Sequence, residues 1–421
     1  MLMVFLTLRV CPMMSQETVT LSGIITDSVT GKGLPFAQVS VQNSTTGTVS
    51  NDDGVFQLNL PGRRAHDTLL VAYLGYVTAR VEIPATSVSA LAFRLKPKAI
   101  DLSEVEIKSL TPEEVIRQVV LHIPANYGST PVILTAFIRS RKFLNNRLAE
   151  YTEAIIEDMK AGYTAYDRRN EKERHEQSNV PLLLKGRVVS DTSLVNAIGD
   201  LGKSAGCLGC NFINDFVEFY HHTVLDEKLF SSYSFRMEEL SRPEGGKLYH
   251  IWFDQRKGVK ETLWKGEIFV NAADFALLKI AQKPSFEAFE PYERQKYKRP
   301  YFIGGTPGWY EEMPLMDWTT TWSARNGNYY LSTIRSDNWM TFKNPATGKT
   351  IRYDYRNDVV VTDASRDEEK IKNFRGDKST GVNQRWDQVV GKEDRVFWRD
   401  FNYLPVEEKL KEALIKMNEK K

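Results

Sequence analysis

The fold is decided by the stretch GIITDSVTGKGLPFAQVSV at residues 23–41, followed by TGTVSNDDGVFQL at 46–58 and LLVAYLGY at 69–76. Short apolar runs alternate with polar residues there, and turn residues interrupt them about every 8–12 positions, which is typical of an all-β sandwich. Alternation places Val39 and Val41 on one face of a strand, and Phe56 and Leu58 on one face of another. The sequence predicts strands at 18–25, 37–42, 54–60, 67–74, 76–83 and 91–95.

The same stretches resemble the carboxypeptidase-like regulatory domain, a transthyretin-like sandwich of envelope proteins of Bacteroidota. The resemblance is carried by Gly23, Asp27, Gly31, Pro35, Ala37, Val39, Thr46-Gly47-Thr48, Asp53-Gly54, Phe56, Leu58 and Gly75-Tyr76. It implies a fold and no activity, because this module is a structural appendage in its family. A zinc carboxypeptidase is excluded, since no histidine is followed by Glu three positions on and no H-E-x-x-H is present.

Composition limits the class of protein. The chain has 421 residues, 42% hydrophobic and 26% charged, so it can bury a core, and ~150 residues per domain suggests two or three domains. Lys and Arg number 56 against 54 Asp and Glu, a net charge of +2, which disfavours a nucleic-acid binder held by bulk charge. With 3 cysteines it lacks a disulfide framework. No transmembrane helix is expected, because no later apolar run approaches ~18 residues.

Residues 1–17 read as a signal-like leader. MLMVFLTL at 1–8 is apolar, and a cleavage zone falls near Ser15-Gln16, although a basic n-region is missing. We therefore expect an exported protein, in the periplasm or associated with the outer membrane. A lipid anchor at Cys11 is the less favoured alternative, because Arg9 and Val10 stand where small residues are needed.

Residues 97–108 are expected to be a linker, and 109–421 a larger β-rich domain. DLSEVEIKS at 101–109 resembles the junction before the plug of a TonB-dependent receptor, which suggests a role beside outer-membrane uptake. The residues that follow resemble uncharacterised envelope proteins of Bacteroidota. Thr111, Pro112 and Glu114 predict the start of a helix with a capping box, and Pro124 is expected to end it.

The rest of this domain reads as hairpins and a final helix. Alternation predicts strands at 247–255, within 265–283 on either side of a turn at 271–274, over 316–342 with Asn326-Gly327 as a type I′ turn, and within 347–364. Near the C-terminus, Pro405 precedes a helix whose apolar stripe should pack on the sheet, formed by Val406, Leu410, Ala413, Leu414 and Met417.

The predicted fold class is mainly β: an N-terminal seven-stranded-type β-sandwich at 18–96, then a larger antiparallel domain with a few helices. The larger domain should be a curved sheet or partial barrel, loosely like the lipoprotein-carrier folds, an analogy that rests on pattern alone. The charge-rich segment 166–179 is expected to be a solvated loop.

Cys207 and Cys210 form a C-x-x-C. The alternatives are a local disulfide, which export favours, free thiols, a metal site with His221 and His222, and redox catalysis. The preceding residues 202–206 match G-x-S-x-G, but they lack the strand of a nucleophile elbow and are read as a flexible loop.

The segment 281–322 is rich in aromatic residues, with 10 in 42 positions, and reads as a long loop. Gly304-Gly305 and Pro307-Gly308 place a loop tip there, where aromatic rings beside polar groups could bind a glycan or a protein. The candidate ligand or partner surface is Trp309, Tyr310, Tyr301 and Phe302. The alternative is that the rings pack over one end of the sheet.

These observations favour a non-enzymatic envelope or secreted protein for binding or assembly, accessory in one version to outer-membrane uptake. No catalytic, cofactor-binding or metal-ligating residue is assigned, no cofactor is expected, and the partner would be an envelope protein or a glycan, not a nucleic acid. The alternative is a hydrolase whose carboxylates come from separated strands and form no linear motif.

Overall fold

The computed structural model describes most of the chain. The described residues are 18–98, 110–163, 180–198, 215–218, 220–221, 223–241, 246–259, 263–285, 300–312, 315–376 and 401–418. The predicted leader, most of the linker, the loop at 166–179, the G-x-S-x-G and the C-x-x-C lie outside these residues. No helix in the described part is both long and apolar enough to cross a membrane.

The N-terminal region is the predicted β-sandwich, and its described residues form seven strands in two sheets. The first sheet has the order β4-β1-β7, with β1 (Thr18–Asp27), β4 (Val55–Pro61) and β7 (Val88–Leu95). The second has the order β3-β2-β5-β6, with β2 (Gln38–Val41), β3 (Gly47–Val49), β5 (Thr68–Ala72) and β6 (Ala79–Glu82).

The predicted alternation supplies the core of the sandwich. Val39, Phe56 and Leu58 are fully buried and belong to one apolar cluster. β1 pairs antiparallel with β4 on one side and parallel with β7 on the other. It is therefore the central strand of its sheet.

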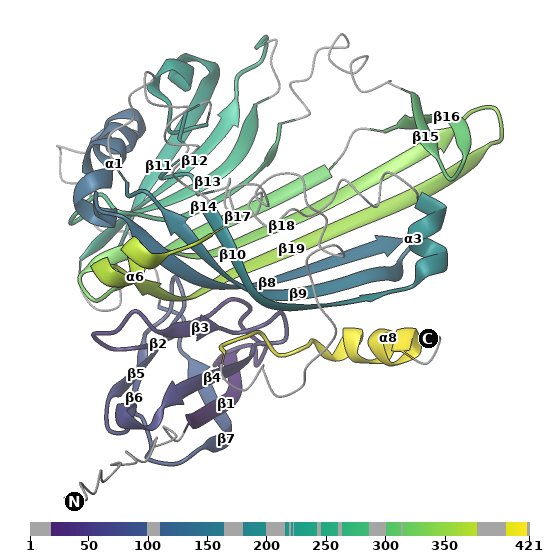
Figure 1. Cartoon of the computed structure of the whole chain (residues 1–421). Coiled ribbons are helices and arrows are strands. Elements are labelled where there is room, and N and C mark those ends of the chain that lie inside the picture. Colours follow the sequence, from purple (N-terminus) through teal and green to yellow (C-terminus); the bar gives the residue numbers. More distant parts are fainter. Residues whose placement is uncertain are drawn as a thin grey trace, which may run out of the picture.

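The second region is built on one large antiparallel sheet, in which the described residues form 12 strands (Figure 1). Ten of them follow the order β10-β9-β8-β19-β18-β17-β14-β13-β12-β11, and β16 pairs with β15 and β18 beside that path. The bounds are β8 (Val132–Leu144), β9 (Arg147–Lys160), β10 (Val180–Ser190), β11 (Tyr233–Ser241), β12 (Lys247–Gln255), β13 (Trp264–Asn271), β14 (Leu277–Pro284), β15 (Pro300–Ile303), β16 (Thr306–Glu311), β17 (Leu315–Arg325), β18 (Asn328–Asn344) and β19 (Lys349–Ser365). The described strands do not close, because β10 and β11 stand at opposite ends of the order.

The hairpin β17–β18 turns where the sequence predicts. Asn326 and Gly327 have φ values of 46° and 82°, both in the left-handed region that a type I′ turn requires. The strand predictions at 247–255, 265–283 and 347–364 also match β12, β13–β14 and β19.

The helix α1 (Pro112–Tyr127) begins at the predicted capping box but continues past the predicted end. Pro124 lies inside it, and the helix ends at Gly128, whose φ is 78°. The expectation that Pro124 ends the helix is wrong, because a proline near the C-terminal end removes only one backbone donor while Val119, Ile123 and Tyr127 keep the last turns buried. The shorter helices are α3 (Thr192–Ile198), α6 (Glu368–Asn373), α8 (Glu408–Asn418) and the 3₁₀ turns η1 (Gly62–Arg64) and η4 (Glu227–Ser232).

Replacing Thr111 with alanine should lower the free energy of unfolding by about 1 kcal/mol. Thr111 Oγ1 accepts a hydrogen bond from the Glu114 N–H at 3.2 Å, while Glu114 Oε2 accepts one from the Thr111 N–H at 2.7 Å. Urea titration measures the loss, and Thr111→Ser is the control because it keeps the hydroxyl. An equal loss in both variants would contradict the capping role.

The large sheet is covered differently on its two faces. Its inner face carries Ile138 and Ala154, which pack in one cluster with α1. Its outer face carries Phe137 and Ile155, which pack with Val49 of the sandwich. Figure 1 shows the sandwich below the long strands of the sheet.

Residues 401–407, which we call the strap, lie between the sandwich and the outer face. The Asn59 N–H donates to Asn402 Oδ1 at 2.6 Å, and Asn59 Nδ2 donates to the carbonyl oxygen of Phe401 at 2.8 Å. Asn51 Nδ2 donates to the carbonyl oxygen of Pro405 at 3.1 Å. The strap therefore satisfies polar groups of the sandwich that would otherwise face the sheet.

The helix α8 follows the strap and packs as predicted through four of the five stripe residues, while Val406 precedes the helix. Leu410, Ala413, Leu414 and Met417 join one apolar cluster with Tyr151 of β9. The helix begins at Glu408, later than the sequence suggests, because the preceding Glu407 is buried as an ionic partner of the sheet.

Candidate functional site

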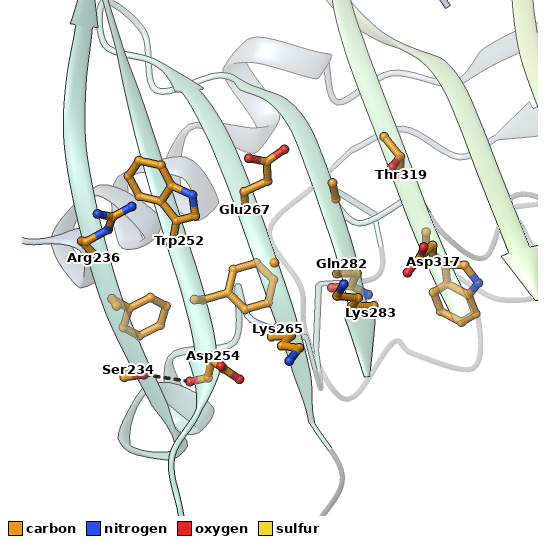
Figure 2. A pocket seen from close by; sticks show the side chains of 15 residues that line it. Ser234, Arg236, Trp252, Asp254, Lys265, Glu267, Gln282, Lys283, Asp317 and Thr319 are labelled. Atoms are coloured by element: carbon orange, nitrogen blue, oxygen red, sulfur yellow. Dashed lines mark hydrogen bonds between the residues drawn. The ribbon is translucent and has the colours of Figure 1, made fainter. Parts of the chain in front are cut away.

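A groove of about 700 Å³ lies across five neighbouring strands, β11, β12, β13, β14 and β17 (Figure 2). One row of its lining residues consists of Ser234, Asp254, Lys265, Lys283 and Asp317, and the other of Arg236, Trp252, Glu267, Ala281 and Thr319. Adjacent members of the second row are register partners from strand to strand. Because strand side chains alternate, both rows point to the outer face and the positions between them turn inward.

A close approach of β13 and β14 forms part of the groove floor. A Cβ atom at Gly266 would lie 2.0 Å from the carbonyl oxygen of Ala281. Glycine is therefore required at this position.

An ion-paired histidine stands beside the groove. His250 Nε2 lies 2.9 Å from Glu267 Oε2, and His250 Nδ1 lies 3.4 Å from Glu238 Oε1. Lys279 Nζ lies 2.8 Å from the other oxygen of Glu267. The hydrogen bond with His250 and the contacts with Lys279 lower the pKa of Glu267 to about 2. Glu267 therefore keeps its negative charge at any physiological pH.

Aromatic contacts hold this set of charges in place. The Arg236 guanidinium carbon lies 3.9 Å from the centre of the Trp252 ring, a cation–π contact. The His250 ring lies 3.7 Å from the Trp252 ring and 4.0 Å from the Phe269 ring, centre to centre. Figure 2 shows Arg236, Trp252 and Glu267 on three successive strands. The groove thus presents charged side chains around the Trp252 ring, which is itself in contact with Arg236 and His250.

A second group of titratable residues is buried on the inner side of the sheet. Lys160 Nζ lies 2.6 Å from Glu218 Oε2 and 3.4 Å from Asp215 Oδ2. Tyr163 Oη and Trp322 Nε1 donate to the two oxygens of Asp215 at 2.8 and 3.0 Å. These contacts attach the segment 215–218 to β9 and β17.

Asp158 completes this buried group without a hydrogen bond to either carboxylate oxygen among the described residues. Its exposed fraction is 0%. Burial raises the pKa of Asp158 to about 7, against the opposing effect of the Lys160 ammonium. A carboxyl group of this pKa suits acid–base catalysis, but water has no access to it here. In the described part of the chain no three His, Cys, Asp or Glu side chains are placed to hold a metal ion.

The predicted candidate surface is only partly exposed. Trp309 lies in β16 with 5% of its surface exposed and packs with Phe342 and Tyr353. The expected exposure of Trp309 is wrong, because β16 pairs with β18 and lays this ring against the sheet. Its neighbour Tyr310 points the other way and is 38% exposed.

Tyr301 and Phe302 belong to β15, which pairs with β16, and their side chains lie outside what the structure describes. The prediction of one long loop over 281–322 is also wrong. Residues 281–284 end β14, 300–311 form a hairpin, and 315–322 belong to β17. Of the histidines considered for a metal site, His221 lies 3.4 Å from Asp226, while His222 and both cysteines lie outside the described residues.

The outer groove is not among the sites predicted from the sequence, although part of its pattern is visible there. In KLYHIWFDQ at 247–255, alternation places His250, Trp252 and Asp254 on one face. That pattern identifies a polar face with an aromatic residue. The strand register that brings Arg236 and Glu267 beside Trp252 is not readable from the sequence.

Comparison with known proteins identifies the N-terminal region. Residues 21–107 match the family model of the CarboxypepD_reg-like domain. This part of the chain is therefore a CarboxypepD_reg-like domain, in agreement with the resemblance and with the observed sandwich. None of the curated protein sequences matches the chain.

Three solved structures share a distant likeness. One is a protein of unknown function from Bacteroides fragilis NCTC 9343, described as membrane-associated, with 8% identity, 82% of this chain and 98% of that chain covered, and a TM-score of 0.16. The LolA superfamily protein NE2245 from Nitrosomonas europaea has 10% identity, 61% and 95% coverage, and a TM-score of 0.18. MucB in complex with MucA(peri) has 10% identity, 61% and 98% coverage, and a TM-score of 0.18. At these TM-scores the likeness adds nothing to the description above.

Proposed function

We propose that this is a non-enzymatic binding or assembly protein of the cell envelope, whose large sheet engages a partner protein through the outer groove. The observation that carries the proposal is the fixed negative charge of Glu267 in the groove. Glu267 has a pKa of about 2 and is held by His250 and Lys279, so it can neither donate nor accept a proton near neutral pH. Such a site is suited to recognition rather than to proton transfer.

The charges of the groove favour a protein as its ligand. Three cationic residues and three anionic residues line it, namely Arg236, Lys265, Lys283, Asp254, Glu267 and Asp317. A nucleic acid would require an excess of positive charge. A protein surface that carries both signs can match this pattern and fix one orientation. Tyr310, exposed on the β15–β16 hairpin, is a further contact point for the same class of partner.

The apolar leader at 1–8 and the CarboxypepD_reg-like domain support export and a place in the periplasm or at the outer membrane. The strap fixes that domain to the sheet, so the two units would meet a partner as one rigid body. A role beside outer-membrane uptake is the narrower form of this proposal.

Site-specific crosslinking tests the groove. A photoreactive amino acid at Lys283 or Asp317, both exposed, should capture the same envelope protein in intact cells. The same probe at Lys349, exposed at the start of β19, is the control. Arg236→Glu should reduce capture at least tenfold, because it reverses the charge beside Trp252. Equal capture from Lys349, or full capture by the Arg236 variant, would contradict the proposal.

The hydrolase alternative has one observation in its favour, the convergence of Asp158, Asp215 and Glu218 from separated segments. All three are buried, which separates them from water. A hydrolytic activity of the purified protein that is abolished by Asp215→Asn and unaffected by Arg236→Glu would establish this alternative instead.

A further inference from the structure

The strand β11 forms one open edge of the large sheet, at the end of the outer groove. It pairs with β12 over all 9 of its residues without a register shift. Figure 2 shows it as the leftmost strand, which carries Arg236. Within the described part of the chain, the backbone of 234–241 makes no hydrogen bond outside its pairing with β12. Such an edge presents a row of donors and acceptors to which another strand can pair.

The edge at the other end of the sheet is protected, whereas β11 is not. β10 contains Pro181 and Lys185, and its pairing with β9 shifts register between Leu183 and Lys185. The helix α8 also lies against β10. Proline, lysine and irregular pairing are devices by which proteins prevent association of sheet edges. β11 contains neither proline nor lysine, and its charged residues are of both signs. Its sequence therefore does not oppose pairing with a further strand.

The hydrogen bond just before β11 indicates which of its backbone groups face outward. The Arg256 N–H donates to the carbonyl oxygen of Ser232 at 2.9 Å. Hydrogen-bonded pairs alternate along an antiparallel ladder, so the even-numbered residues of β11 bond to β12. The backbone groups of Phe235, Met237 and Glu239 consequently point away from β12. These three residues are available to pair with another strand.

The outer face of β11 carries opposite charges on the two sides of Met237. Arg236 is exposed, its guanidinium lies over the Trp252 ring, and it has no ion-pair partner among the described residues. Glu238 is partly exposed, with Oε1 at 3.4 Å from His250 Nδ1. A carboxylate accepts several hydrogen bonds. Arg236 and Glu238 can therefore each take a further partner of opposite charge.

We propose that β11 pairs with β11 of a second copy of this protein, antiparallel and centred on Met237. In this register Met237 lies opposite itself and Phe235 lies opposite Glu239 of the second copy. The three pairs formed in this way exchange about six backbone hydrogen bonds. Arg236 of each copy then lies opposite Glu238 of the other, at a non-hydrogen-bonded position, where side chains approach most closely. The two sheets become one, with two ion pairs across the two-fold axis.

Neighbouring registers match less well. A pair centred on Arg236 would place arginine opposite arginine, and a pair centred on Glu238 would place glutamate opposite glutamate. Like charges directly opposite each other destabilise a pair of strands. A parallel pairing in register has the same defect. The charges of β11 therefore favour the antiparallel register centred on Met237.

The inner face of β11 is compatible with the same register. Phe235 and Met237 are half-buried and pack against the main core. The two-fold axis brings the two Met237 side chains together and covers apolar surface that the open edge leaves partly exposed. Glu239, which would lie opposite Phe235, already pairs with Lys247, with 3.0 Å between Oε2 and Nζ. Its charge is thus neutralised before the second copy binds.

The inference does not rest on the proposed function, although Arg236 also lines the outer groove. It concerns the backbone edge of β11, where a second copy of the chain pairs, and the proposed function concerns the surface across five strands. Because the groove reaches β11, the pairing would place two grooves end to end across the two-fold axis. A partner protein would then meet a surface twice as long as the one in a single chain.

Light scattering of the purified full-length protein over a range of concentrations tests the proposal. The wild type should be a dimer. Arg236→Glu and Glu238→Arg each place like charges opposite one another twice per dimer, so each should raise the dissociation constant of the dimer at least tenfold. The double variant that carries both substitutions restores opposite charges and should again be a dimer. A purely local role of either residue does not predict this rescue.

Cysteine crosslinking keeps the proposal testable if a charge variant fails to fold. Met237→Cys should give a disulfide-linked dimer on mild oxidation, because the residue faces its own copy. Leu240→Cys on the same strand is the matched control, since its two copies would lie about 20 Å apart. Wild-type protein sets the background from the 3 native cysteines.

Three results would overturn the proposal: a monomeric wild type at all concentrations, a folded double variant that remains monomeric, or equal crosslinking of the Met237 and Leu240 variants. These measurements contain no partner protein. Their failure would therefore leave capture at the groove, and with it the proposed function, unaffected.

Discussion

Replacing Arg139 with methionine should lower the free energy of unfolding by about 3–5 kcal/mol. Arg139 is fully buried in β8 and donates to Glu153 Oε1 at 2.7 and 3.0 Å and to Glu407 Oε1 at 3.1 Å. It also donates to the carbonyl oxygens of Leu404 and Pro405 at 2.5 and 3.2 Å. Methionine would fill the space but leave two carboxylates and two carbonyls in the interior with fewer partners. Urea titration of the full chain measures the change.

The loss of stability in the Arg139 variant should also weaken the attachment of the sandwich, because the strap contacts both units. Pro405 accepts hydrogen bonds from both Arg139 of the sheet and Asn51 of the sandwich, so limited proteolysis of the Arg139 variant should cleave within 401–407 first. The control is Arg352→Met, which removes the 2.9 Å contact between Asp354 and the half-exposed side chain of Arg352. A pair of this kind contributes at most about 1 kcal/mol. Equal losses in the two variants would contradict the role assigned to Arg139.

Asp158→Asn should stabilise the protein, and the gain should increase with pH. The pKa of Asp158 is about 7 in the folded protein against an ordinary value of 3.8, so the folded state binds the proton more tightly than the unfolded state. The stability from that proton is complete below pH ~4 and is lost as the pH rises through 7. Asparagine resembles the protonated acid and does not ionise. The gain should therefore grow by roughly 3 kcal/mol between pH 5 and pH 8.

Denaturant titrations at pH 5 and pH 8 measure this difference. The substitution Glu267→Gln should have the opposite effect and lower the free energy of unfolding. The pKa of Glu267 is lowered to about 2, so its ionised form contributes stability above its ordinary pKa of 4.5, and this contribution fades as the pH falls toward 2. Glu267 is about 29% exposed, so solvent screening should keep the loss near 1 kcal/mol. A gain from Asp158→Asn that is the same at both pH values would contradict the shifted pKa.

The sandwich could be predicted from the sequence because its signals are local. The turn at Asp53-Gly54 and the alternation around Phe56 act over a few residues, and the structure buries Phe56 as expected. The strands β8 and β9 are different, since Arg139 and Glu153 look like solvent-facing positions in the sequence. They are buried because the strap, whose Pro405 is 266 positions from Arg139 in the sequence, covers them.

The candidate sites depend on relations that the sequence does not contain. The outer groove requires the register of several strands, in which Trp252 pairs with Arg236 and with Glu267. The expected exposure of Trp309 failed for the same reason, because its burial depends on the pairing of β16 with β18. Aromatic content does not reveal which ring faces water, since Trp309 is 5% exposed and its neighbour Tyr310 is 38% exposed.

The position of the strap also affects the order in which the protein can be completed. Asn59 is bonded to Phe401 across 342 positions of sequence, so this connection between the two units cannot form until nearly the whole chain has been synthesised. Domains that form during synthesis fold from the N-terminus onward. The sandwich can thus form early, while the charged surface around Arg139 and Arg141 remains uncovered until the last segment arrives. During that interval Arg139 keeps Glu153 and Arg141 keeps Asp358 as ionic partners, and only their shared contact with Glu407 is missing.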